Sequence, residues 1–343
     1  MQMKISSFLQ SLLTLVLVSF ILVVAKSFLI PLVYSLFIAI IIYPMCKFLE
    51  SKGIHRGIAI FIPLILVCVL FAGLIMLLSY EMALLSGKWP LLQEKIYPLI
   101  DQLQDFLYQK FGWTSQEQMG WIEDGLKRLS ENAGAIIQET SKATFEAILN
   151  LVIIPIYITL ILIYRGKIVT FVIALAPLHY KDKIPVVLND TIVMFSKFIR
   201  GMVFVYMIVG ILNTLGLWII GTENPLVYGM LTAIMTIIPY FGILISALLP
   251  ITISWLSTGT VWQPLGIITI FTSVQYLEAN LVFPYVVGKH VNLNTLVSIL
   301  VIFIGGLIWG VAGMILFLPL VAMFRIFAEH FPETKHWSDF LKK

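Results

Sequence analysis

The chain has 343 residues, of which 60% are hydrophobic and only 12% are charged, and its mean hydropathy is +1.00. Soluble domains average about half apolar and a quarter charged residues, so the composition excludes a water-soluble enzyme, a disordered chain and a disulfide-stapled secreted domain. The net charge of +4 is too small and too scattered to indicate nucleic-acid binding. The composition therefore predicts an all-α polytopic membrane protein with the lipid bilayer as its main partner.

Residues 1–80 contain three apolar stretches, each near the roughly 20 residues that cross a bilayer as a helix. These stretches are Phe8–Ala25, Phe28–Met45 and Gly57–Tyr80. Lys47, Lys52 and Arg56 lie between the second and the third stretch, and basic residues mark cytoplasmic loops. The sequence predicts three N-terminal membrane helices with a cytoplasmic N-terminus.

Residues 81–146 differ in kind, because they contain no spanning stretch and carry ten acidic residues against six basic ones. Three membrane helices that start from a cytoplasmic N-terminus end outside the cytoplasm, and the acidic character of these residues agrees with that location. Apolar residues recur at helical spacing, as in Trp121, Ile122, Leu126 and Leu129. We expect an extracytoplasmic region of amphipathic helices, either a cap over the membrane bundle or an element that binds a partner.

Residues 147–164 form the expected fourth membrane helix, which contains Pro155. Residues 165–200 carry six basic residues against two acidic ones, which indicates a cytoplasmic connector. Its apolar residues suggest short amphipathic helices on the inner membrane face. The fifth span is expected from Gly201 to Ile220.

Two later stretches are too long for one ordinary span. Residues 225–256 are nearly uncharged and are interrupted at 239–242, and residues 292–324 have Gly305, Gly306 and Gly310 at their centre. Gly266–Val282 between them is an ordinary span. If both stretches are single spans, the chain has about eight crossings and Lys289 lies outside. If both are re-entrant helical hairpins, Lys289 is cytoplasmic, and the abnormal lengths with central breaks favour this arrangement.

Broken helices at membrane depth are tolerated where they line a cavity, and transporters use them to bind substrate near the midplane. Pro239, Tyr240, Phe241 and Gly242 would supply a break, aromatic walls and one hydroxyl. A second set of residues permits hinging or close packing of helices. That set is Pro284, Gly305, Gly306, Gly310 and Gly313. Ordinary small-residue packing explains the glycines of this set equally well.

Glu278 is an acidic residue near the end of an otherwise neutral span, and a carboxyl group at such depth is a candidate functional site. Gln275 precedes it by three residues, so both side chains face one side of a helix. Asn280 and Asn213 are further polar candidates. The competing interpretation is an interfacial carboxylate that reaches water or pairs with Lys289. We place the proposed transport site in a C-terminal membrane unit, residues 201–328, followed by a cytoplasmic tail, residues 329–343.

Motifs of catalysis are missing from the sequence. It has no Walker sequence, no HExxH and no Gly-x-Ser-x-Gly. Its five histidines are dispersed, and Cys46 and Cys68 each lie in an apolar stretch. We expect no enzyme activity, no metal site and no cofactor.

The C-terminal half resembles the AI-2E transporter family, also called the autoinducer-2 exporter or PerM-like permease family. One group of matching residues is Phe198-Ile199-Arg200-Gly201, then Ile238-Pro239-Tyr240-Phe241-Gly242 and Pro250. A second group is Gln275, Glu278, Asn280, Pro284 and Gly288, followed by Gly305, Gly306, Gly310, Gly313 and Leu318-Pro319-Leu320. Pro31 and Tyr43-Pro44 are consistent with it. The chain departs from the family pattern at Met202 and at Leu293-Asn294.

The resemblance implies an oligomeric permease of the bacterial inner membrane. Characterised members are assigned to export of the quorum-sensing furanone autoinducer-2, and others are described as sodium/proton antiporters. The leading hypothesis is therefore a secondary transporter or exporter of a small polar solute by alternating access. The alternatives are an antiporter that couples sodium to protons through Glu278, and a non-transporting scaffold or sensor that uses residues 81–146.

Overall fold

The computed structural model describes residues 13–14, 16–73, 75–76, 151–239, 241–288 and 292–342. The predicted 81–146 region, Tyr240, Lys289 and His290 lie outside these described residues. Over the described ranges the chain is helical, and its β-bridge is a single isolated pair, Leu293 with Lys342. The prediction of an all-α membrane protein is confirmed.

Seven helices in the described ranges are long and apolar enough to cross a membrane. They are α2 (Lys26–Ser51), Arg56–Gly73, Leu151–Leu175, α5 (Ile184–Ile220), α7 (Phe241–Thr258), Trp262–Val287 and Val311–His330, the last of which is α11. The shorter helices are α6 (Pro225–Met235), α10 (Thr295–Trp309), α12 (Lys335–Leu341) and the 3₁₀ turn Leu178–Tyr180. Trp262–Val287 begins with α8 (Trp262–Leu277) and continues into two π-helical segments, η2 (Glu278–Val282) and η3 (Pro284–Gly288), the second of which ends one residue beyond the candidate span.

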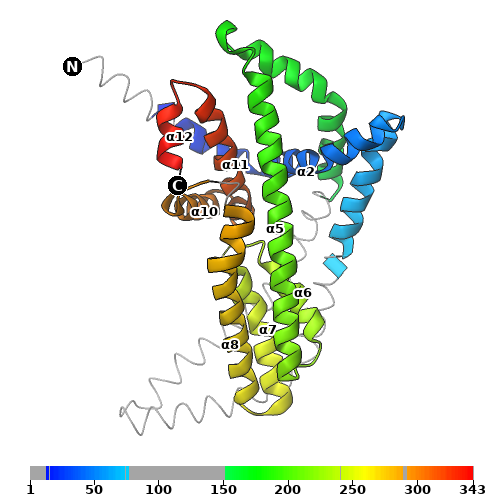
Figure 1. Ribbon diagram of the computed structural model, residues 1–343, viewed down its shortest axis with the longest axis vertical. Helices are drawn as coiled ribbons and strands as arrows, with labels where there is room; N and C mark the ends of the chain where they lie inside the picture. The colour runs from blue at the N-terminus through cyan, green and yellow to red at the C-terminus, as the bar shows by residue number, and fades with distance from the viewer. Residues whose placement is uncertain are drawn as a thin grey trace, which may run out of the picture.

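The 37-residue helix α5 is the central element (Figure 1). Its first half is crossed by α2, where the rings of Phe37 and Phe195 are 4.5 Å apart. Its second half packs with α6 and α8. It ends at Gly221, whose φ of 77° is a left-handed conformation that glycine adopts without strain.

The start of α5 corrects one sequence expectation. We expected short helices over 165–200 and a new span from Gly201, but residues 184–200 are the first half of one continuous helix. Pro185 stands at its beginning, where a missing N–H breaks no intrahelical bond. The polar residues that suggested a separate connector lie along α5 without interrupting it, because Phe195 and Phe198 on the same stretch are buried.

The stretch expected to break at 239–242 does so. Helix α6 ends at Met235 and α7 begins at Phe241, and α7 turns back along α6. A Cβ atom built on Gly242 would collide with the carbonyl oxygen of Met235, so only glycine permits this close approach. Figure 1 shows the outer ends of both helices at the lower end of the molecule, next to the start of α8.

The second long stretch also breaks, at Gly310 rather than at Gly305-Gly306. Gly310 has φ 60° and joins α10 directly to α11. A Cβ atom on Gly305 would lie 2.5 Å from the carbonyl oxygen of Gly313, so the two helices touch backbone to backbone. Asn294 caps α10 by accepting from Val297 N–H, and its own N–H donates to Leu341 O beside α12.

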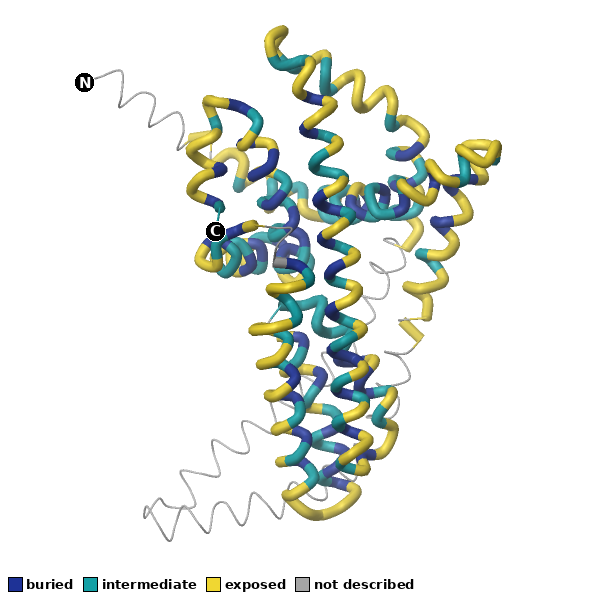
Figure 2. The backbone as a smooth tube through the Cα atoms, viewed as in Figure 1, coloured by how far each residue is buried: buried dark blue, intermediate teal, exposed yellow. Residues whose placement is uncertain are grey.

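Large apolar side chains cover the outside of the molecule. Trp218 is 69% exposed and Leu307 is 87% exposed, and Figure 2 shows exposed positions along the outer faces of the long helices. An apolar exterior of this extent is the surface of a protein embedded in lipid. The buried core gathers where α2, α5, α10 and α11 meet.

Candidate functional site

Glu278 stands where α8 changes from α-helical to π-helical hydrogen bonding. Six residues later Pro284 begins the second π-helical segment. Proline lacks the N–H that would bond four residues back, and its ring displaces that carbonyl. The distorted stretch 278–288 therefore has a local cause, and π-helical turns of this kind are frequent at functional sites.

Gln275 and Glu278 form a direct hydrogen bond. The amide Nε2 of Gln275 donates to Oε2 of Glu278 at 2.7 Å. Both side chains are half-buried, and both belong to the candidate span Trp262–Val287. The structure thus brings together the two polar groups that the sequence spacing placed on one face.

The π-helical stretch packs against α5 at the Arg200-Gly201 motif. A Cβ atom on Gly201 would lie 2.9 Å from the carbonyl oxygen of Val286. Val287, next to it, is fully buried among side chains of the core. Two motifs far apart in the sequence therefore form one contact, which fixes the segment beyond Glu278 onto α5.

The α6–α7 hairpin packs beside α8, the helix that leads to Glu278. Helix α7 rises about 27 Å from the lower end and α8 rises about 24 Å from the same end, at 1.5 Å per residue. The start of α7 and the end of α8 are therefore at similar distances along the helices from that end. Pro239 is half-buried, Phe241 is exposed and Gly242 is buried, but among the described residues no hydrogen bond joins them to Glu278. Tyr240, the predicted hydroxyl, lies outside the described residues.

The two asparagines differ from each other. Asn280 is exposed, and its amide donates to the carbonyl oxygen of Tyr276 at 2.9 Å, so it does not bond to the Gln275–Glu278 pair. Asn213 on α5 is completely buried, and its amide donates to Val209 O at 2.9 Å. Its Oδ1 has no partner among the described residues.

The glycines predicted to permit hinging or close packing lie at the contact between α10 and α11, not beside Glu278. Gly305, Gly306 and Gly313 lie at the α10–α11 contact, and Gly310 makes the turn between the two helices. Next to that turn, Trp309 Nε1–H donates to Leu22 O at 2.9 Å, which attaches the turn to the N-terminal helical segment. The described residues therefore show close packing for this set, and no hydrogen bond or ion pair connects it to Glu278.

The π-helical geometry is the feature that sequence reasoning missed. The available signal was Pro284, a proline six residues beyond an intramembrane acid with no sign of a helix end between them. Within the described ranges, no group of three His, Cys, Asp or Glu side chains is placed to hold a metal ion. The polar groups joined by a hydrogen bond at Glu278 are one carboxyl group and one amide.

Comparisons with known proteins agree with this architecture. The sequence pattern of the AI-2E family transporters matches residues 11–333. A Bacillus subtilis protein named "Putative transport protein YrrI" is 26% identical over 319 residues, which cover 90% of this chain and 88% of that protein. YueF of the same organism is 26% identical over 323 residues (88% and 84% covered), and YhhT of Escherichia coli is 22% identical over 305 residues (89% and 85% covered); both have the same kind of name. The chain is a multi-pass membrane protein with a role in transport, and it belongs to the AI-2E transporter family.

Proposed function

We propose that this chain is a secondary transporter of a small polar solute and that the Gln275–Glu278 pair is its binding site. The observation that carries the proposal is the 2.7 Å hydrogen bond between an acid and an amide inside a candidate membrane span, at a π-helical break. A carboxyl group at membrane depth is costly and is kept where it binds cargo or a proton.

The chemistry of the pair suits a hydroxylated solute better than an ion. Gln275 uses one amide hydrogen on Glu278, and its carbonyl oxygen and second hydrogen stay available to a guest. A carboxylate accepts hydrogen bonds from hydroxyl groups, and a carboxylic acid donates one as well. Autoinducer-2, a small polyhydroxylated furanone derivative, is the cargo we propose, with Tyr240 of the α6–α7 turn as a further wall.

The distribution of charge supports an orientation in the membrane. The turns around 52–56 and 176–183 and the tail after α11 lie in the upper half of Figure 1 and are rich in Lys and Arg. The turns at 221–224 and 259–261 lie at the lower end and carry Glu223 alone. We infer that the upper end is cytoplasmic, with both termini.

In this orientation the α6–α7 pair is a re-entrant hairpin. Helix α6 has 11 residues and rises about 16 Å, which is too short for a 30 Å hydrocarbon core. The α6–α7 hairpin would enter and leave the membrane on its outer side. The α10–α11 hairpin would enter and leave on the cytoplasmic side. Alternating access would move the C-terminal unit, residues 201–328, against the remaining spans of a homo-oligomer in the bacterial inner membrane.

Reconstituted transport tests the proposal. Proteoliposomes containing the wild-type chain are loaded with autoinducer-2 and its release is followed, alongside Glu278→Gln and Glu223→Gln. We expect Glu278→Gln to reduce the flux at least about tenfold, because one well-placed hydrogen-bonding group is lost. Glu223→Gln is expected to transport like wild type, because Glu223 is exposed in the 221–224 turn, away from Glu278. Equal flux in both variants would remove Glu278 from the mechanism. A proton gradient that collapses on addition of sodium would show cation/proton antiport instead.

A further inference from the structure

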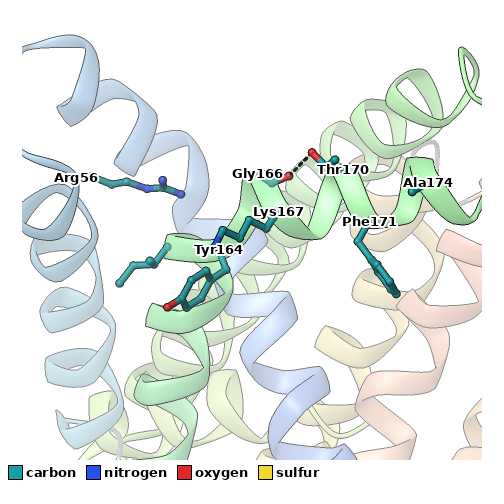
Figure 3. Close-up of a pocket in the computed structure, with 8 residues that line it drawn as sticks. Arg56, Tyr164, Gly166, Lys167, Thr170, Phe171 and Ala174 are labelled. Carbon is teal, nitrogen blue, oxygen red and sulfur yellow. Dashed lines mark hydrogen bonds between the residues drawn. The ribbon is translucent and has the colours of Figure 1, made fainter.

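A cavity of about 650 Å³ lies away from Glu278, between the beginning of the Arg56–Gly73 helix and the Leu151–Leu175 helix (Figure 3). Arg56 reaches it from the first helix, and Tyr164, Lys167 and Phe171 line it from the second. Figure 3 shows that the second helix changes direction between Tyr164 and Phe171, and the cavity lies along this bend. It has no role in the proposed transport site.

Two cations face this cavity without an acidic partner. Arg56 donates to the carbonyl oxygen of Leu162 at 2.6 Å, and Lys167 Nζ lies 5.4 Å from the centre of the Tyr164 ring. Among the described residues, neither has a carboxylate within ion-pair distance. Arg165, two residues before Lys167 on the second helix, is by contrast paired with Glu50. The cavity therefore keeps two positive charges that an anionic ligand would neutralise.

The surroundings of the two cations are apolar and exposed. Phe61, on the first helix, is 60% exposed and Phe171, on the second, is 62% exposed. Ile58 and Ile62 are also largely exposed. Both helices are candidate membrane spans, so these exposed apolar side chains are suited to contact with lipid acyl chains. A ligand with one anionic end and an apolar body matches this arrangement.

The hydroxyl of Thr170 does not provide a further donor, because it already donates to Gly166 O at 3.0 Å (Figure 3). Recognition of the anion therefore depends on Arg56 and Lys167. Arginine binds phosphate oxygens through paired N–H groups, and lysine adds a mobile point charge. Basic pockets between membrane helices at the cytoplasmic surface are suited to phosphate head groups.

We propose that this cavity binds an anionic phospholipid. Its phosphate would lie between Arg56 and Lys167, and its acyl chains would follow the exposed apolar faces of the Arg56–Gly73 and Leu151–Leu175 helices. The bound lipid would fill the space at the bend of the second helix and neutralise the positive charges of Arg56 and Lys167.

Lipid binding to the full-length chain in detergent tests this proposal. Dioleoyl phosphatidylglycerol and dioleoyl phosphatidylcholine are titrated against the wild type, and bound lipid is counted by native mass spectrometry. We expect Lys167→Gln to weaken phosphatidylglycerol binding about fivefold and the double variant Arg56→Gln/Lys167→Gln to abolish the preference over phosphatidylcholine. Lys167→Arg keeps the charge and is expected to bind as wild type. Lys52→Gln is the matched control, because Lys52 lies over the Phe48 ring, outside the cavity.

Three results would overturn the proposal. The first is equal binding of phosphatidylglycerol by the wild type and the double variant, provided that both elute as folded protein in size-exclusion chromatography. The second is displacement of the lipid by millimolar inorganic phosphate, which would identify a site for free phosphate. The third is a disulfide between two copies of a Phe171→Cys variant, which would show that protein fills the cavity.

Discussion

Gly201 on α5 lies directly against Val286 in the π-helical segment η3. A Cβ atom at position 201 would be 2.9 Å from the Val286 carbonyl oxygen and 3.1 Å from Val287 Cγ2. The carbonyl oxygen is backbone and cannot rotate away, so the spacing of the two elements depends on the missing side chain. This contact positions the stretch that begins with Glu278.

The Gly201→Ala substitution is expected to destabilise the chain. The added methyl group must displace η3 from α5, and overpacking of this kind costs about 1–3 kcal/mol, only partly offset by the better helix propensity of alanine. Thermal unfolding in detergent measures the change. Gly73→Ala is the matched control, because a Cβ atom at Gly73 meets nothing within 4 Å. A Gly201→Ala variant as stable as Gly73→Ala would show that the contact is not tight.

Neighbouring glycines on α10 provide a second test. A Cβ atom on Gly305 would meet the Gly313 backbone at 2.5 Å, whereas one on Gly306 would meet the flexible end of Met314 at 2.7 Å. Met314 can change rotamer and the backbone cannot, so we expect Gly305→Ala to lower the free energy of unfolding by about 1–3 kcal/mol and Gly306→Ala by clearly less. Chemical denaturation of both variants in detergent gives the difference. Equal losses would contradict the backbone contact.

At Asn213 we expect a substitution that does not destabilise the chain. Its buried Oδ1 has no partner among the described residues, and an unpaired buried polar group costs about 1–3 kcal/mol. Leucine has the same number and branching of side-chain heavy atoms and removes that polar group, so Asn213→Leu should unfold at the same or a higher temperature than wild type. Asn213→Ala leaves a cavity and should unfold at a lower temperature. If the leucine variant is the less stable of the two, Oδ1 has a partner in solution, such as a water molecule.

The Tyr180–Glu333 pair predicts a pH dependence outside the membrane spans. The Tyr180 hydroxyl lies 2.5 and 2.6 Å from the two carboxylate oxygens of Glu333. This hydrogen bond lowers the pKa of Glu333 and raises the pKa of Tyr180. A carboxyl whose pKa is lowered on folding adds stability above its ordinary pKa of about 4.3, and this stability is lost as the pH falls through the lowered value.

Thermal unfolding of wild type and Tyr180→Phe between about pH 3 and pH 7 measures this contribution. Near neutral pH the wild type should unfold at a slightly higher temperature, and the difference should vanish at the acid end. The effect is small because the hydrogen bond between the two groups is exposed to solvent. A difference that persists unchanged to pH 3 would show that the hydroxyl of Tyr180 acts independently of the charge on Glu333, because the ring that packs on Phe331 is kept in both proteins.

Local patterns predicted the parts of the fold that depend on local causes. The break before Phe241 follows from Pro239 and Gly242, and the hydrogen bond of Gln275 to Glu278 follows from their three-residue spacing on one helix. For the second long stretch, the sequence pattern indicated a break within the cluster of Gly305, Gly306 and Gly310, and the break lies at Gly310. The exact position depends on which of them adopts a positive φ, and this is decided by packing between α10 and α11.

Features that depend on distant contacts could not be predicted in this way. Polar residues along 184–200 resemble a connector, yet burial of Phe195 against Phe37 makes the stretch part of α5. The cavity at Arg56 and Lys167 forms between helices that are separated in the sequence by the long 81–146 region. Single-chain periodicity contains no information about which charges remain unpaired after such helices meet.

Solvent access to position 278 tests the central claim most directly, because a transport site must be reached by water and solute from at least one side of the membrane. Glu278→Cys is made in a chain in which the two native cysteines, Cys46 and Cys68, are replaced by alanine. It is then treated with a small membrane-impermeant thiol reagent in sealed, oriented vesicles. We expect position 278 to be labelled from at least one side of the membrane. A thiol that stays unlabelled from both sides, while the exposed Glu223→Cys control is labelled, would contradict the account.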